Sequence, residues 1–410
     1  MANVSSSNGL EKRPKLRFPG FDEPWKETTL SALFSKSTQK NADGHITNVI
    51  CNSAKLGLIP QREYFDKDIA NSDNTSGYYI IRQNDFVYNP RKSYDAPYGP
   101  IRSYKYAEDG IVSPLYLCFH AKRKINPMFY EWYFRSSAWH RYIYMSGDSG
   151  ARHDRVSIKD DTFFAMPINL PSEREQSKIA SFLQSLDERI AAQEKLVASL
   201  KKYKRGVVRT LLSPKHCKLK NVEWTTAKIG DIGTFIKGAP LSKADISSDG
   251  TPFILYGELY TTYNEVISKV VRKTQASVDK QYYSQIGDVI IPTSGETPEE
   301  ISTASCVMLP DIILAGDLNI YRCTQVDGRI MSYILNHVVN DRIARVAQGK
   351  SIVHVQATEI SKIEITYPDL ISQKKLIETF DAITARIDQS MRELELLQVH
   401  RKALLQQLFI

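Results

Sequence analysis

Two stretches of the sequence, residues 172–212 and 371–410, carry the same long heptad pattern. Apolar side chains recur at alternating steps of four and three residues, which places them on one stripe of an α-helix and is the pattern of a coiled coil. Polar residues interrupt both ladders at matching rungs, Gln193 and Lys204 in the first and Ser390 and Arg401 in the second. The sequence therefore predicts an internal repeat built around two long helices.

The simplest way to bury two such stripes is to pair the helices antiparallel. The alternative is that each helix lies against its own globular domain, although the stripe is too long for one small domain to cover. The apolar rungs that we expect to pair the helices are Ile179, Leu183, Leu186, Ile190, Val197, Leu200, Leu376, Phe380, Ile383, Ile387, Leu394 and Leu397.

The segments that precede the two helices match as well. Residues 25–33 and 224–232 both begin with Trp and carry apolar side chains five and eight positions later. Short β-prone runs separated by Asn, Asp, Gly and Pro follow in both parts, which is typical of strands and turns. The predicted class is therefore α+β. The predicted organisation is a disordered lead-in at 1–16, an α+β domain at 17–171, a long helix at 172–213, a second α+β domain at 214–370 and a second helix at 371–410.

Charge and cysteine content restrict the kind of protein. The net charge of +8 and the pI near 9.0 favour an anionic partner. The five cysteines are scattered and never in CxxC spacing, which is typical of a reducing compartment and argues against a zinc site. No apolar run approaches the roughly 20 residues of a membrane helix. These features predict a soluble, cytoplasmic protein.

Catalytic motifs are missing from the sequence. It contains no GxxxxGK[ST] phosphate loop, no GxGxxG after a strand and no HExxH, and its eight histidines are dispersed. A DNA amino-methyltransferase would need an Asn/Asp-Pro-Pro-aromatic motif to hold a flipped base, and the nearest text, residues 89–92, lacks the second proline and the aromatic. We therefore expect no catalytic residues and no metal, and we interpret the chain as a binding protein.

The order of parts, domain, helix, domain, helix, resembles the specificity subunit of type I restriction–modification enzymes. No single motif is diagnostic, but the resemblance extends from about Arg17 to the C-terminal helix. The segments that carry it are the domain openings 18–30 and 222–232, the strands 83–88 and 286–291, the turn and strand 348–360, and the helix starts 171–190 and 370–387.

The resemblance implies two diverged α/β target-recognition domains, separated by two long antiparallel coiled-coil helices in a pseudo-twofold repeat. Each domain would read one half of a bipartite, asymmetric double-stranded DNA target, and the helix pair would set the spacing. Two modification (methyltransferase) subunits would bring S-adenosylmethionine, and two restriction (translocase and nuclease) subunits would use ATP and Mg. The chain itself would be non-catalytic and would bind no cofactor.

Base edges are read by side chains with hydrogen-bonding groups, and phosphates are bound by basic residues. On that ground, DNA contacts in the first domain are predicted at Arg82, Arg91, Lys92, Tyr94, Ser149, Arg152 and His153. In the second domain they are predicted at Lys237, Lys243, Thr293, Ser294, Glu296, Lys350, Ser351 and His354. Each has a plain alternative: the basic residues could be ordinary solvated side chains, Glu296 could cap the segment that follows it, and the histidines could simply end strands.

Two other functions stay open at this stage. A non-nucleic-acid scaffold could use the helical hairpin as a docking rod for other proteins, and its binding would not depend steeply on salt. A self-sufficient methyltransferase or nuclease would turn over without partners, and the missing motifs disfavour it.

Overall fold

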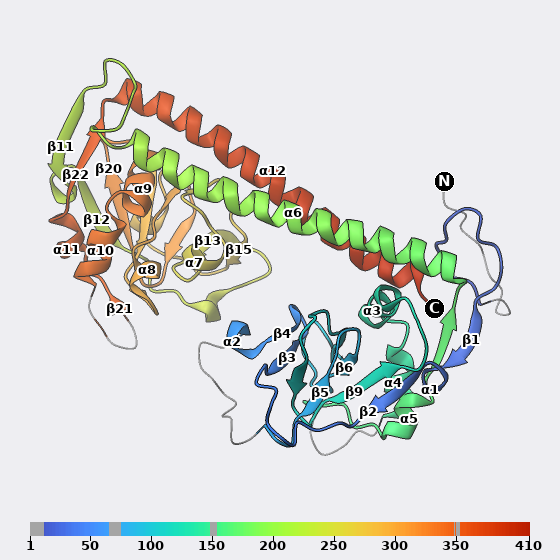
Figure 1. The fold of residues 1–410 in the computed structure, drawn as a ribbon. Helices are drawn as coiled ribbons and strands as arrows, with labels where there is room; N and C mark the ends of the chain where they lie inside the picture. The colour runs from blue at the N-terminus through green and yellow to red at the C-terminus, as the bar shows by residue number, and fades with distance from the viewer. Residues whose placement is uncertain (1–11, 65–74, 148–153, 348, 350–352) are drawn as a thin grey trace. The chain divides into compact units, whose positions relative to one another are not determined.

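The structure is a computed structural model that describes residues 12–64, 75–147, 154–347, 349 and 353–410 (Figure 1). The chain forms two compact units, the first made of residues 1–194 and 393–410 and the second of residues 195–392. Helix α6 (Glu173–Leu211) and helix α12 (Leu370–Leu408) have 39 residues each, and both units contain part of each helix. The fold is a mixture of helices and strands, as the sequence predicted.

The first unit is built on a four-stranded antiparallel sheet with the order β2-β9-β6-β7. Its elements are β1 (Lys26–Thr29), α1 (Leu30–Leu33), β2 (Phe34–Ser37), β3 (Ile50–Ser53), β4 (Gly57–Pro60), α2 (Gln61–Tyr64), β5 (Tyr79–Ile81), β6 (Phe86–Tyr88), β7 (Ile101–Ser103), β8 (Gly110–Val112), β9 (Leu117–Ala121), α3 (Pro127–Arg135), α4 (His140–Ser146), α5 (Asp160–Phe164) and β10 (Pro167–Leu170). Two-stranded pairs β1-β10, β3-β4 and β5-β8 complete it.

Aromatic side chains fill the core of the first unit. Helix α3 begins where the side chain of Asn126 accepts a hydrogen bond from the backbone N–H of Phe129, with Pro127 in the first turn. The helix then buries Phe129, Trp132 and their neighbours against β2, β6 and β9. Figure 1 shows α3 beside the start of α6, which packs into the same core. This aromatic cluster is therefore structural, and it leaves no stacking platform for bases.

The second unit is built on a five-stranded sheet with the order β12-β20-β16-β18-β14. Its elements are β11 (Trp224–Lys228), β12 (Gly233–Lys237), β13 (Thr251–Leu255), α7 (Glu258–Thr261), β14 (Val266–Ile267), β15 (Arg272–Thr274), β16 (Asp288–Pro292), β17 (Ser294–Gly295), α8 (Pro298–Ile301), β18 (Ser305–Val307), β19 (Ile313–Ala315), β20 (Leu318–Cys323), α9 (Gly328–His337), α10 (Asn340–Val346), β21 (Val353–His354), α11 (Ala357–Ser361) and β22 (Glu364–Pro368). Short 3₁₀ turns occur at Ile229–Asp231, Lys243–Asp245 and Lys280–Tyr282.

Corresponding strands in the two units pair in the same register. In the first unit Lys26 of β1 lies opposite Leu170 of β10, and in the second Thr225 of β11 lies opposite Tyr367 of β22. The central strands follow the same order, since β2-β9-β6-β7 corresponds to β12-β20-β16-β18. Each unit then continues through two helices, a short extended segment, a short helix and a strand into a 39-residue helix. The matched spacing of residues 25–33 and 224–232 therefore coincides with matched strand pairing.

The apolar stripes of the long helices are buried from both sides within each unit. In the first unit Leu183 of α6 and Leu408 of α12 share the core with Trp25 and Phe129. In the second unit Val208 of α6 packs with the α12 stripe and with α9. Every apolar rung predicted from the sequence is buried or half-buried. Within a unit each stripe thus packs against the globular part and against the other helix. Both helix–helix pairing and packing on a domain therefore contribute to its burial.

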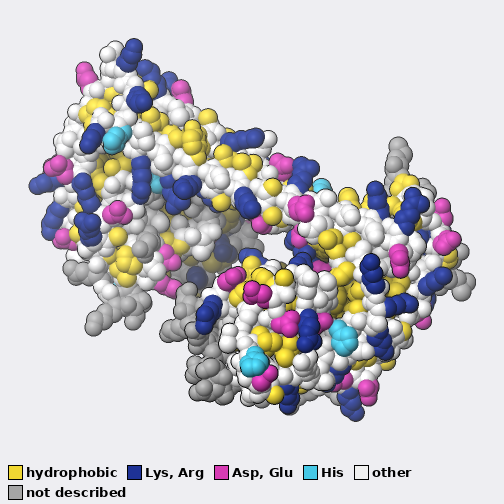
Figure 2. Space-filling view, viewed as in Figure 1, with side chains coloured by type: hydrophobic (Ala, Val, Ile, Leu, Met, Phe, Trp, Pro, Cys, Tyr) yellow, Lys and Arg dark blue, Asp and Glu magenta, His cyan; other side chains and the backbone are white. Residues whose placement is uncertain are grey.

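Other apolar side chains on these helices stay exposed. Figure 2 shows apolar surface along the helices, among interspersed basic and acidic side chains. In the second unit Tyr203 is 60% exposed, next to a shallow groove that includes Gly206 and Val207. In the first unit Leu396 and Val399 are more than half exposed. The helices therefore present apolar surface beyond the stripes that they bury.

The start of the described chain is held in place by α12. The backbone N–H of Leu16 donates to the carbonyl of Gln407, and that of Trp25 donates to the carbonyl of Lys12. Residues 12–16 are thus ordered, although they belong to the lead-in predicted to be disordered, while residues 1–11 lie outside the described part. No helix among the described residues is long and apolar enough to cross a membrane.

The charged rung Lys204 takes part in a buried ionic cluster of the second unit. Its Nζ lies 2.8 Å from Oε2 of Glu265, and Nε2 of His337 lies 2.7 Å from Oε1 of the same carboxylate. Burial alone would raise the pKa of Glu265, but the hydrogen bond from His337 and the charge of Lys204 outweigh it and lower the pKa to about 2. The cluster fixes α6 to α9 and to the segment before β14.

The matching rung of α12, Arg401, lies in an ionic cluster of the first unit. Arg401 and Arg135 both bind the carboxylate of Asp187 on α6, with Nη1 of Arg135 at 2.9 Å. Burial raises the pKa of Asp187, but the two guanidinium groups more than offset this and lower it. The charged interruptions of the two ladders, Lys204 and Arg401, are therefore sites where each helix forms ion pairs with the rest of its unit.

Replacing Leu183 with Ala should lower the free energy of unfolding of the first unit by about 2–5 kcal/mol, because it leaves a cavity in a fully buried core. Denaturant unfolding followed by tryptophan fluorescence would measure this, since Trp25, Trp132 and Trp139 all lie in that core. Leu396→Ala is the matched control at a site that is 58% exposed, and it should change the free energy by less than about 1 kcal/mol. Equal effects of the two variants would contradict the described packing.

Replacing Glu265 with Gln should destabilise the second unit by about 3 kcal/mol or more at neutral pH, because it leaves Lys204 buried without a carboxylate. The ionised carboxylate stabilises the folded state fully above its ordinary pKa of 4.5, and this contribution is lost as the pH falls toward about 2. The difference between wild type and variant should therefore shrink over that range when denaturant unfolding is repeated at several pH values. Glu378→Gln, at an exposed position of α12, should show no such trend.

Candidate nucleic-acid interface

The same backbone arrangement occurs where β6 and β16 end. In the first unit the chain after β6 runs beside residues 154–156: Arg91 lies opposite Arg155, and the N–H of Val156 donates to the carbonyl of Pro90 at 2.9 Å. In the second unit the chain after β16 forms β17, which pairs with β21 so that Ser294 lies opposite His354. Residues 154–156 come shortly before α5, and β21 comes shortly before α11. Each unit thus has a pair of facing residues at the carboxyl end of a central strand.

Three of the predicted residues of the first unit lie together at this end of the sheet. Arg91, Lys92 and Tyr94 are exposed, and the side chain of Tyr94 is fully accessible. The backbone N–H of Lys92 donates to the carbonyl of Asp154 at 2.8 Å, which holds the run beside the neighbouring segment. Long side chains are therefore presented from a backbone that is fixed on both sides.

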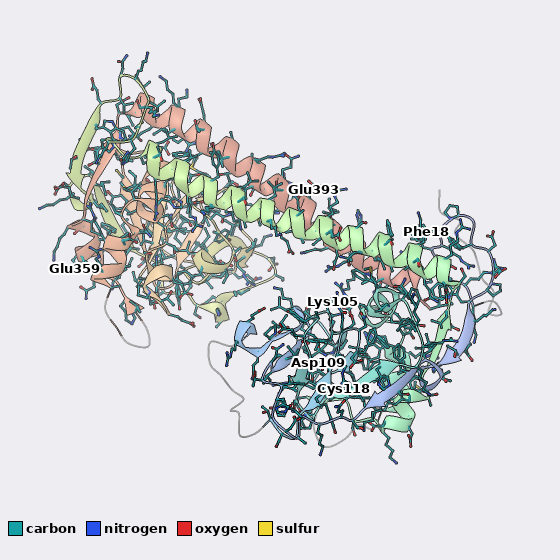
Figure 3. All side chains as sticks on the ribbon, viewed as in Figure 1. Phe18, Lys105, Asp109, Cys118, Glu359 and Glu393 are labelled. Atoms are coloured by element: carbon teal, nitrogen blue, oxygen red, sulfur yellow. The ribbon has the colours of Figure 1, made fainter. Side chains whose placement is uncertain are left out.

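Arg82 lies elsewhere. It precedes β6 and so occupies the opposite end of that strand from Arg91. Its guanidinium donates to Oε1 of Gln39 at 2.9 Å and lies 3.5 Å from Oδ2 of Asp109, which is labelled in Figure 3. The structure therefore gives Arg82 an acidic partner and does not bring it together with Arg91.

The second unit places Lys237 at the same sheet end as Ser294 and His354. Lys237 ends β12 opposite Asn319 of β20, and Asn319 also lies opposite Ile291 of β16. Strands β12 and β16 therefore run in the same direction and end together. Lys237 and His354 are both exposed. Lys243 is exposed as well, in the 3₁₀ turn that follows β12.

Ser294 is buried rather than presented to solvent. Its hydroxyl lies 3.1 Å from Oδ2 of Asp317, and its carbonyl accepts a hydrogen bond from the hydroxyl of Tyr260 at 2.5 Å. Half-buried Thr293 is held by a backbone hydrogen bond to Asp317. These contacts give Ser294 a structural role, and its side chain is not available at the surface in this conformation.

Glu296 does not cap the helix that follows it. Thr297 is the N-cap of α8, and its hydroxyl accepts a hydrogen bond from the N–H of Glu300. The carboxylate of Glu300 in turn accepts from the backbone N–H of Glu296. The exposed side chain of Glu296 is therefore left outside the cap, which removes the structural alternative considered for it.

Five predicted contacts, Ser149, Arg152, His153, Lys350 and Ser351, lie outside the described residues. In the sequence Ser149, Arg152 and His153 come before residues 154–156, and Lys350 and Ser351 come before β21. Their participation stays a prediction.

Arg155 is a residue of this region that the sequence reasoning missed. It is half-buried beside Tyr116, whose pKa is raised by burial, while the positive charge of Arg155 acts in the opposite direction. The repeat could have identified it, because Arg155 occupies the position in the first unit that His354 occupies in the second. Among the described residues no group of three or more His, Cys, Asp or Glu side chains could hold a metal ion.

Residues 221–398 match the family model described as the type I restriction modification DNA specificity domain. A solved structure described as the structural basis of complex assembly and conformational transition of the type I restriction–modification system aligns with 94% of this chain and 97% of its own, at 14% identity and a TM-score of 0.63. The crystal structure of a type I S subunit from M. genitalium aligns with 97% of this chain and 99% of its own, at 15% identity and a TM-score of 0.54. Comparison with curated proteins finds no match.

Ser294 and His354 face each other, but Ser294 is buried and His354 is exposed, so their substitutions should have different effects on stability. Ser294→Ala should lower the free energy of unfolding of the second unit by about 1 kcal/mol, because it removes a buried hydrogen bond to Asp317. His354→Ala, at the exposed partner, should change it by less than about 0.5 kcal/mol. Thermal and denaturant unfolding of both variants would test this, and a larger loss for His354→Ala would contradict the assignment.

Proposed function

Because residues 221–398 belong to the type I restriction modification DNA specificity domain family, and the chain has the fold of type I specificity subunits, we propose that it is the sequence-specific DNA-binding subunit of such a complex. Each unit reads one half of a bipartite, asymmetric double-stranded target. The chain directs methylation and restriction that are carried out by partner subunits.

The repeated sheet end is the observation that supports this proposal most directly. A backbone arrangement with the same pairing recurs in the two units, while the exposed side chains on it differ: Arg91, Lys92 and Tyr94 in one and His354 in the other, where Lys237 lies at the same sheet end. A backbone that is the same in both units, with different hydrogen-bonding side chains on it, suits two domains that bind different half-sites. It also resembles, within one chain, a dimeric repressor on a two-part operator.

The long helices fit the docking of partner proteins. Exposed Tyr203 with the groove around Gly206 and Val207 lies on one helix, and exposed Leu396 and Val399 lie on the other. Exposed apolar patches often mark protein–protein contacts. In the proposal, two modification subunits cover these faces and hold S-adenosylmethionine, and two restriction subunits use ATP and Mg. The paired helices set the spacing of the half-sites.

Methylation mapping of genomic DNA tests the proposal. Cells that carry this chain with its cognate modification subunit should show a two-part asymmetric methylated motif with a fixed spacer. The motif should disappear when this chain is deleted and return when it is supplied again. A methylation pattern that does not depend on this chain would contradict the proposal and favour the scaffold function.

The dependence of binding on salt provides a control in vitro. The affinity of the reconstituted complex for a duplex with the mapped motif should fall linearly with the logarithm of salt concentration, because phosphate contacts release counterions. A flat salt dependence without sequence preference would favour a scaffold.

A further inference from the structure

The facing residues Arg91 and Arg155 form an unusual pair. They lie directly opposite each other on neighbouring antiparallel segments, and like charges in this position destabilise a pair of strands. Among the described residues neither guanidinium forms a hydrogen bond or an ion pair with a side chain. Tyr116, which lies near Arg155, does not supply the missing negative charge, because burial raises its pKa and keeps it protonated. Nothing in the described part of the fold requires two arginines here.

The equivalent place in the second unit has no arginine. The same antiparallel pairing holds Ser294 opposite His354, and the N–H of Val355 donates to the carbonyl of Thr293 just as that of Val156 donates to Pro90. A site that only bound a phosphate would be served by a cation in both units, since phosphates are alike along DNA. The backbone is kept and the side-chain chemistry changes, which is what readers of different bases require.

We infer that the position occupied by Arg155 in the first unit and by His354 in the second determines specificity, each residue reading one base edge of its half-site. Arg155 acts together with Arg91, and the pair suits the two acceptors O6 and N7 of a guanine in the major groove. His354 acts without its buried neighbour Ser294. This inference rests on the proposed function, because it assumes that each unit binds DNA.

The reciprocal variants Arg155→His and His354→Arg test the inference. The reconstituted complex would be measured in competition binding with duplexes that carry each base at each position of both half-sites. Arg155→His should change preference at one position of the first half-site by about 5- to 150-fold and leave the second half-site and the spacer unchanged. His354→Arg should change preference at one position of the second half-site and leave the first half-site and the spacer unchanged.

Lys105→Ala is the matched control for the first unit. Because Tyr88 lies opposite Ile101 and Phe86 opposite Ser103, Lys105 lies beyond the end of β7 that is far from Arg91. It is an exposed basic residue of the same unit, and its removal should alter preference at no position.

Three results would overturn the inference. Unchanged preferences in both swapped variants would show that these positions do not read bases. An equal loss of affinity for all duplexes would show that Arg155 contacts a phosphate. A change in both half-sites from one swap would show a general effect on the fold. In each case the wild-type complex would still select its two-part motif, so the proposed function would stand; only loss of that selection in the wild type would refute it.

Discussion

The burial of the two long helical stripes determines how this chain folds. No single surface buries either stripe. Within each unit a stripe packs on the globular part and on a segment of the other helix. In the first unit Leu183 and Leu408 reach the same core as Trp25. In the second, Val208 lies in the same core as Phe380 and Tyr333. Since burying an apolar side chain contributes about 1.5–3 kcal/mol, such shared cores hold segments that are far apart in sequence.

Because the cores fix the strands and helices of each unit, the framework of a unit is separate from the exposed side chains at its sheet end. The sheet order, the register of the strand pairs and the ionic clusters around Asp187 and Glu265 belong to the frame of each unit. The exposed side chains after β6 and β16 belong to no core, so they can change without loss of stability. A chain built in this way can diverge in what its two units bind while its helices stay the same.

The long-range order of the chain could be predicted from the sequence because the signals are periodic. Heptad spacing gave the two helices within two residues of their ends, and the repeated Trp-led segments matched β1 and β11. Which polar side chains were structural could not be predicted, because that depends on contacts across the fold. Ser294 follows a strand and resembles a loop residue, yet Asp317 and Tyr260 enclose it. Arg155 lacked a local signal, and only its correspondence with His354 in the repeat could have pointed to it before its pairing with Arg91 was known.

The placement of Leu408 and Phe409 in the core around Trp25 has a consequence for biosynthesis. As the ribosome extends the chain, residues of the first unit emerge early, but the side chains that close their core are translated almost four hundred residues later. The second unit, whose segments are contiguous from 195 to 392, is complete before the first. The nascent chain therefore finishes its units in the reverse of their order in the sequence, and until it does so an aromatic core that begins near residue 25 has an open side.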